Sequence, residues 1–162
     1  NLDAPGFVGD ICEEIQRLLG ESKPLGADYR RRLKLKARRG HKESELEVTG
    51  ADGSEFRVRM RQSESNPLDF SVILGYCLPN SNRLFRLRRY NGKSHEHCNR
   101  LEGERFYDFH IHEATERYQA EGAEEEKFAR ITDRYTTVEG ALECLMGDCG
   151  FVRPEDDQQS LL

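Results

Sequence analysis

The sequence predicts an α+β fold, namely a mostly antiparallel β-sheet meander of about six strands with helices packed on one of its faces. Three observations support this prediction. Apolar residues recur at helical spacing near both ends of the chain, whereas the middle alternates between apolar and polar residues with a period of two. Short segments rich in Gly and Asp separate the alternating runs, as turns do between antiparallel strands. The 162 residues match the usual size of one domain.

Residues 1–153 are expected to form that single domain, and residues 154–162 an acidic, flexible tail. No apolar run approaches the roughly 20 residues needed to span a membrane, and the first residues lack the basic and apolar regions of a signal peptide. The 5 cysteines include no C-x-x-C pair. We therefore expect a cytoplasmic protein with reduced thiols and without a membrane partner.

Three segments are predicted to be helical. Residues 8–20 have apolar side chains at helical spacing and end on a glycine that suits the position after a helix. Helical spacing returns over residues 123–131. A last helix is expected to begin with a capping box formed by Thr136 and Glu139 and to end at Gly147. Its inward positions are Val138, Ala141, Leu142, Leu145 and Met146.

Six segments alternate as strands do. They are residues 29–38, 44–49, 55–62, 70–78, 84–90 and 105–112. One face of the first segment is wholly basic, and Arg57, Arg59 and Arg61 share one face of the third. Glu45 and Glu47 lie on the matching face of the second segment. Pairing of opposite charges between strands, at roughly 0.2–1 kcal/mol a pair, is therefore the simplest explanation of the pattern.

The net charge of −5 conceals a strong asymmetry along the chain. Residues 30–105 contain 18 Lys and Arg against 10 Asp and Glu, which leaves 7 against 20 in the rest of the chain. A basic middle between acidic ends indicates either a face that binds a polyanion or a pairing of the chain's own segments.

Histidine placement is the strongest local signal. Four of the 5 histidines fall in two H-x-H stretches, one formed by His95 and His97 and the other by His110 and His112. In an extended backbone, residues i and i+2 point to the same side, about 7 Å apart. Each stretch can therefore present two imidazoles to one site.

Three interpretations of the four histidines stay open. They are an acid and base pair that needs no cofactor, ligands of one divalent metal ion, or polar residues at strand ends without a chemical role. As ligands they would be joined by Glu102, which extends the first stretch to an H-x-H-x4-E pattern similar to the first metal motif of cupin barrels.

An arginine cluster precedes the histidines. Arg86, Arg88 and Tyr90 share one face of the segment 84–90 by alternation, and Arg89 lies on the other. Matching the apolar faces of this segment and of 105–112 places Arg86 and Arg88 on the side of His110 and His112. Guanidinium groups bind phosphate bidentately, and a tyrosine ring offers a stacking surface for an unpaired base. The cluster of Arg86, Arg88, Arg89 and Tyr90 is therefore a candidate phosphate-binding site.

Three stretches of the chain resemble an uncharacterised bacterial family found in genomic islands. They are Arg-Arg-Tyr-Asn-Gly at residues 88–92, the first H-x-H stretch with Asn99, and the second H-x-H stretch with Ala-Thr-Glu-Arg-Tyr at residues 114–118. The resemblance implies a genomic context and an architecture but no known activity. More remotely, residues 44–112 are similar to the TumE-like toxins of toxin–antitoxin pairs. Those toxins usually have Arg-Tyr-Asp-Asn with histidines soon after, whereas this chain lacks the Asp and has an extra strand between its histidine pairs.

We therefore expect an RNA-directed protein of a bacterial conflict system, either toxin–antitoxin or phage defence, with metal-independent RNA cleavage as its candidate activity. The expected partners are RNA and a protein such as an antitoxin. One alternative is a non-catalytic binding module that docks on a nucleoprotein complex or a protein, and another is a histidine-ligated metalloprotein. The sequence contains no P-loop, Rossmann glycine pattern, G-x-S-x-G or H-E-x-x-H motif, which disfavours ATPases, dehydrogenases, α/β-hydrolases and zincins.

Overall fold

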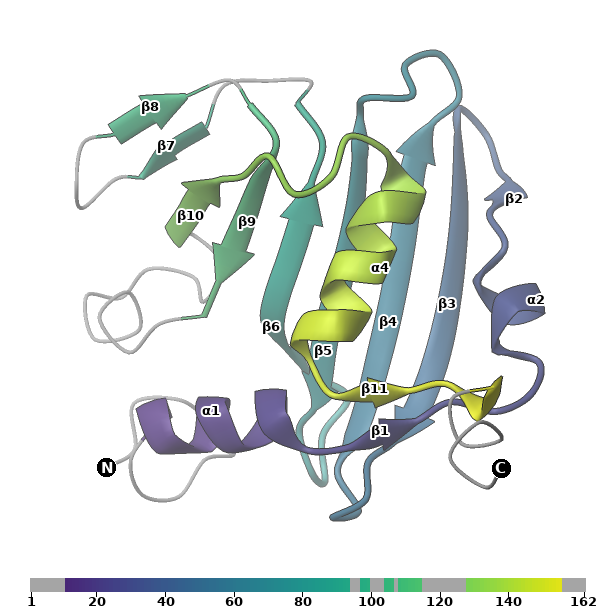
Figure 1. Ribbon diagram of the computed structural model, residues 1–162, viewed down its shortest axis with the longest axis vertical. Coiled ribbons are helices and arrows are strands. Elements are labelled where there is room, and N and C mark those ends of the chain that lie inside the picture. Colours follow the sequence, from purple (N-terminus) through teal and green to yellow (C-terminus); the bar gives the residue numbers. More distant parts are fainter. Residues whose placement is uncertain (1–10, 94–96, 100–103, 107, 115–127, 156–162) are drawn as a thin grey trace.

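A seven-stranded antiparallel sheet with the strand order β10-β9-β6-β5-β4-β3-β2 forms the centre of the molecule (Figure 1). The computed structural model describes residues 11–93, 97–99, 104–106, 108–114 and 128–155. The strands of the sheet are β2 (Lys36–Ala37), β3 (His41–Thr49), β4 (Glu55–Ser63), β5 (Phe70–Cys77), β6 (Leu84–Asn91), β9 (His110–Glu113) and β10 (Phe128–Ile131). The prediction of an α+β fold with a mostly antiparallel sheet is confirmed.

The other described elements are two small strand pairs and three helices. The strand pairs are β1 (Lys23–Pro24) with β11 (Phe151–Val152), which run parallel, and β7 (His97–Asn99) with β8 (Glu104–Phe106), which run antiparallel. The helices are α1 (Ile11–Gly20), α2 (Tyr29–Leu33) and α4 (Val138–Asp148). None of these helices is long and apolar enough to cross a membrane.

Helix α4 covers one face of the sheet, over β5 and β6 (Figure 1). The alternation of apolar and polar residues along each strand decides which side chains lie beneath the helix. Phe56, Val58 and Met60 of β4 are buried beneath the helices, whereas the arginines between them are half-buried or exposed on the opposite face. The helix contributes Val138, Ala141, Leu145 and Met146 to the core, and Leu142 is partly buried. The helices therefore leave one sheet face polar, which we call the open face.

Residues 29–38 were predicted to be a strand, and this prediction is wrong. Residues 29–33 form helix α2, and only Lys36 and Ala37 pair with β3. Tyr29 and Leu33 are both buried. Their separation of four residues satisfies helical spacing as well as period two, and the basic residues between them remain in solvent on the far side of the short helix.

Two further predicted segments differ from the structure. The predicted strand 105–112 is divided into β8 and β9, with a short connection that includes residues 108 and 109. Residues 128–131, predicted to be helical, form strand β10, which pairs with β9; residues 123–127 lie outside the described residues. Pairing with the edge of the sheet satisfies the backbone groups of this short segment and outweighs a weak local helical pattern.

The last helix was predicted with the correct inward face but with wrong ends. Thr137 rather than Thr136 is its N-cap, and the hydroxyl oxygen accepts a hydrogen bond from the backbone N–H of Gly140 at 3.0 Å. The helix continues through Gly147 to Asp148. A glycine with positive φ follows only at Gly150, where φ is 78°.

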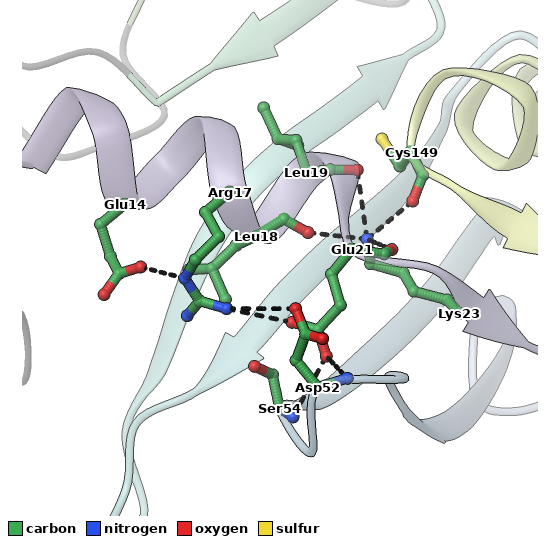
Figure 2. A network of polar contacts seen from close by, with 9 residues as sticks. All are labelled: Glu14, Arg17, Leu18, Leu19, Glu21, Lys23, Asp52, Ser54 and Cys149. Carbon is green, nitrogen blue, oxygen red and sulfur yellow. Dashed lines mark hydrogen bonds and ion pairs between the residues drawn. The ribbon is translucent and has the colours of Figure 1, made fainter.

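A buried lysine joins the two ends of the described chain (Figure 2). Lys23 is 0% exposed, and Nζ lies within hydrogen-bonding distance of four carbonyl oxygens. Those of Leu18, Leu19 and Glu21 lie at 2.7, 3.2 and 2.9 Å, and that of Cys149 lies at 2.7 Å. Burial lowers the pKa of Lys23 to about 8, so the amine remains protonated at neutral pH. One ammonium group thus satisfies carbonyl groups at the ends of both α1 and α4.

Glu21 extends this network to the turn between β3 and β4 (Figure 2). Its buried carboxylate accepts hydrogen bonds from the backbone N–H groups of Asp52 at 3.0 Å and Ser54 at 3.2 Å. Arg17 lies 3.4 Å from the same carboxylate. The network therefore connects α1, the β3–β4 turn and the end of α4.

The predicted tail begins with residues that are held in place. The Glu155 carboxylate accepts hydrogen bonds from the Tyr29 hydroxyl at 2.6 Å and from Arg30 at 2.7 Å. Residues 156–162 lie outside the described residues.

Candidate functional site

The registers of the sheet place polar side chains in rows across the open face. One row contains Glu43, Arg61, Ser71, Asn91 and His110. The next contains Glu45, Arg59, Ile73, Arg89 and His112. Each row crosses five strands, from β3 to β9. Arginines of β4 and β6 therefore lie on the same side of the sheet as the second histidine pair.

A β-bulge in β6 decides which arginines belong to this face. Leu74 of β5 pairs with Arg88, but the next residue, Gly75, pairs with Arg86. Leu87 is therefore an extra residue, and alternation is interrupted there. Arg86 and Arg89 end on the open face, whereas Arg88 and Tyr90 end on the face covered by α4.

The predicted placement of Arg88 beside His110 and His112 is consequently wrong. Arg88 Nη1 lies 3.4 Å from the Tyr90 hydroxyl and 3.9 Å from Asp148 of α4. Glu113 lies 3.9 Å from the other terminal nitrogen of this guanidinium. Arg88 belongs to a charged cluster under α4, on the opposite side of the sheet from the two histidines.

Tyr90 cannot stack on a base, because its ring is 0% exposed. Its hydroxyl donates to Asp148 at 2.5 Å, and burial raises the pKa of Tyr90 well above its usual value. Arg134 binds the same carboxylate with both terminal nitrogens, at 2.9 and 2.8 Å. Burial would raise the pKa of Asp148, but the hydrogen bonds from Arg134 and Tyr90 outweigh it and lower that pKa. This part of the predicted phosphate site is a structural cluster.

His110 and His112 lie side by side, as the H-x-H spacing predicted. Their ring centroids are 4.9 Å apart. Nδ1 of His110 lies 2.7 Å from the carbonyl oxygen of Asp108, which can only accept, so this nitrogen carries the proton. Nε2 lies 3.4 Å from Asn91 Nδ2 and can accept a hydrogen bond from that amide. The two residues are 1% and 6% exposed, so this conformation shields their rings from solvent.

The first histidine pair is only partly within the described residues. His95 and Glu102 lie outside the described residues, and only the backbone of His97 is described, in strand β7. Within the described part of the chain, no group of three or more His, Cys, Asp or Glu side chains is placed to hold a metal ion. The proposed ligand set therefore stays a prediction.

Opposite charges pair between β3 and β4, as the alternation predicted. Arg59 Nε lies 2.6 Å from Glu45, and Arg57 Nη2 lies 3.5 Å from Glu47. Arg61, by contrast, has no ion pair with any side chain in the described ranges. Arg57 and Arg59 are thus each paired with a glutamate of β3. Arg61, near the other end of β4, is not.

Beside Arg61 the surface is hollowed into a pocket of about 620 Å³ at the edge formed by β2. We call it the basic pocket. Its charged lining consists of Arg32, Lys36, Arg38, Arg59, Arg61, Glu43 and Glu45. The five cations outnumber the two carboxylates, so the pocket has a positive potential that favours anions.

No protein-family model, curated protein or solved structure matches this chain. Any functional assignment therefore depends on the residues and geometry of the chain itself.

Three of the described cysteines offer no reactive thiolate. Cys149 is fully buried, and burial raises its pKa to about 11. Burial also raises the pKa of Cys77 and of Cys144. Their thiols are therefore protonated at neutral pH, and nucleophilic catalysis by these three residues is disfavoured.

Sequence reasoning missed Asn91 and the basic pocket. Asn91 was noted only as part of an Arg-Tyr-Asn string, although it lies beside His110 in the same row. Lys36 and Arg38 were assigned to a strand face, yet they reach the pocket from the short strand β2 and the chain after it. The signal available was the basic alternation itself, which predicted the charge of this edge but not its concave shape.

Proposed function

We propose that this protein binds RNA on the open face of its sheet, mainly through the phosphate backbone. The observation that supports the proposal is the register, which aligns Arg59 of β4 with Arg89 of β6 and places Arg61 in the neighbouring row, beside the basic pocket. Arginine binds phosphate bidentately and is favoured at such surfaces. Base stacking on Tyr90 is not part of the proposal, because that ring is buried.

The carboxylates on this face do not prevent RNA binding. Arg59 and Glu45 are 43% and 48% exposed, and exposed ion pairs contribute only about 0–1 kcal/mol. A phosphodiester can therefore compete for these arginines, and each contact also releases a counterion from the nucleic acid. Arg61 and Lys36 form no ion pair within the described residues, so we expect them to contribute most.

The test is a titration of labelled single-stranded RNA at several salt concentrations, in EDTA, read by fluorescence anisotropy. The variant Lys36→Gln with Arg61→Gln should bind more weakly. Loss of two phosphate contacts should also reduce the slope of log K against log salt by about 1.4. The matched control is Lys34→Gln with Lys42→Gln, which removes the same charge from the helix-covered side of the sheet. In this variant the slope of log K against log salt should not be smaller than in the wild type.

Either of two results would reject the proposal. The first is absence of RNA binding by the wild-type protein at low salt. The second is an equal loss of affinity in both double variants, because net charge rather than the open face would then account for binding.

Metal-independent cleavage of the bound RNA is a second candidate function, and the His110–His112 pair favours it. His110 with its proton on Nδ1 can accept the 2′-hydroxyl proton at Nε2. The 2′-oxygen then attacks phosphorus, the bond to the 5′-oxygen breaks, and His112 donates a proton to that oxygen. Arg89, paired with His112, would stabilise the charged phosphorane. Both rings are buried here, so cleavage requires a rearrangement that exposes them.

Incubation of RNA with the protein in EDTA tests cleavage. The expected products carry 2′,3′-cyclic phosphate and 5′-hydroxyl ends. His110→Ala should abolish them while leaving RNA affinity within about twofold, because the phosphate contacts are intact. Intact RNA at high protein concentration, or equal cleavage by the variant, would overturn the catalytic proposal and leave a binding module.

The setting that we propose is the bacterial cytoplasm, within a toxin–antitoxin or phage-defence system. The Arg-Tyr-Asn string and the two H-x-H stretches, which resemble a genomic-island family, support this setting. A protein partner such as an antitoxin belongs to the same proposal.

A further inference from the structure

The two helices on the covered face leave a gap over β4. Helix α4 lies over β5 and β6, whereas α2 lies beside β3 (Figure 1). A pocket of about 540 Å³ opens between them, and we call it the apolar pocket. Its apolar lining is Tyr29, Leu33, Leu35, Met60, Leu142 and Met146. This volume lies within the roughly 300–1,000 Å³ of small-molecule sites.

The apolar pocket is part of the surface and not a packing defect inside the core. Leu35 and Leu142 are half-buried at its walls, whereas Met60 and Met146 are 4% and 2% exposed at its floor. A ligand with an apolar portion would remove the leucine surfaces from water, which favours binding. Methionine side chains adapt to ligands of irregular shape.

The charges at the mouth are unequal. Glu143 is paired with Arg153, and Arg30 is paired with Glu155. Lys34 and Lys42 also line the pocket, and within the described ranges neither forms an ion pair. Glu139 is the one remaining carboxylate of the lining, and it lies in the first turn of α4, where the helix dipole stabilises its charge. The mouth therefore favours an anionic group near the two lysines.

We propose that the apolar pocket binds an amphipathic carboxylate with an unbranched aliphatic tail. The tail lies over Met60 and Met146, and the carboxylate lies at the mouth between Lys34 and Lys42. This site opens on the helix-covered side of the sheet, away from the open face, although Met60 of β4 lines both pockets.

The two methionines provide a direct reporter. The sequence contains 2 methionines, and both line this pocket. Protein labelled with ¹³C at the methionine methyl groups is titrated with decanoate below its micelle-forming concentration and followed by heteronuclear NMR. Both methyl resonances should shift saturably. Decyltrimethylammonium, which has the same tail and the opposite charge, should shift them much less.

Charge-reversal variants locate the carboxylate. Lys34→Glu with Lys42→Glu should weaken decanoate binding at least about tenfold, or ~1.4 kcal/mol. The control variant Lys36→Glu with Arg61→Glu makes the same change in net charge on the open face of the sheet. It should leave the affinity for decanoate unchanged. The methyl spectrum of each free variant reports whether it is folded.

The proposal is overturned if decanoate leaves both methyl resonances in place, or if the cationic and anionic amphiphiles bind equally. It is also overturned if both double variants weaken binding alike. RNA affinity of the Lys34→Glu and Lys42→Glu variant is measured in parallel, so failure of this site and failure of the RNA-binding face are distinguishable.

Discussion

Lys23 is the residue whose role differs most from what its sequence context suggests. It precedes a proline in a segment that reads as a simple break after the first helix, and nothing in its neighbourhood predicts burial. The structure encloses it completely and places its ammonium among four carbonyl oxygens and over the Phe56 ring, 4.4 Å from the centroid. A buried charge is tolerated only with such compensation. One of its acceptors, Cys149, is 126 positions away, a distance over which local pattern has no predictive power.

Lys23→Met tests this role. The substitution keeps the aliphatic stem but leaves buried carbonyl groups without a donor, which costs roughly 1–3 kcal/mol or more. We expect the free energy of unfolding, measured by urea denaturation, to fall by at least about 2 kcal/mol. Lys42→Met, at an exposed position of β3, should change it by less than about 0.5 kcal/mol. Equal stability of the two variants would contradict the proposed role.

Among candidate site residues, the sequence could predict which residues of one strand lie together. It could not predict which residues of a neighbouring strand lie on the same face of the sheet. His110 and His112 were predicted to lie together because period two requires it, and they do. Arg88 and Tyr90 were assigned to the wrong face because the bulge at Leu87 inserts one residue. A bulge depends on pairing with β5, so the sequence of β6 alone does not reveal it.

At the scale of elements, long alternating segments were predictable and short ones were not. Strands β3, β4, β5 and β6 each have eight or nine residues, and the pattern identified all four. Helix α2 has five residues and strand β10 has four, and both were assigned to the other class. A segment of this length has too few positions to separate a period of two from one of 3.6.

Two glycines have opposite expected effects on stability. A Cβ at Gly92 would lie 1.8 Å from the Leu68 carbonyl oxygen, which is backbone and cannot move aside. Gly147, in the last turn of α4, has no heavy atom within 4 Å of that position. Gly92→Ala should therefore lower the free energy of unfolding by about 3 kcal/mol, whereas Gly147→Ala should raise it by about 0.5–1 kcal/mol.

Thermal and urea denaturation of both variants measure this difference. A stabilised Gly92→Ala variant would show that the close approach of Leu68 is wrong. A destabilised Gly147→Ala variant would show that α4 ends before this residue, as the sequence had suggested.

At the scale of the whole molecule, the patterns of charged and of apolar residues both predicted a sheet with one apolar face and one charged face. The same alternation that buries Phe56 and Val58 places Arg57 and Arg59 on the open face, so the layer arrangement could be predicted from the sequence. Both pockets depend on where β2 and α2 meet the edge of β3, and the prediction of a strand over residues 29–38 excluded that arrangement. The site on each side of the sheet therefore became visible only with the tertiary structure.

The parallel pairing of β1 with β11 has a consequence for biosynthesis. Lys23 pairs with Phe151, so an early segment of the chain completes its contacts with one of the last described segments. A growing polypeptide on the ribosome exposes the apolar side of its meander until α4 and β11 emerge from the exit tunnel. Folding of this sheet is thus completed only after the segment that contains α4 and β11 has emerged, and the nascent chain depends until then on protection from aggregation.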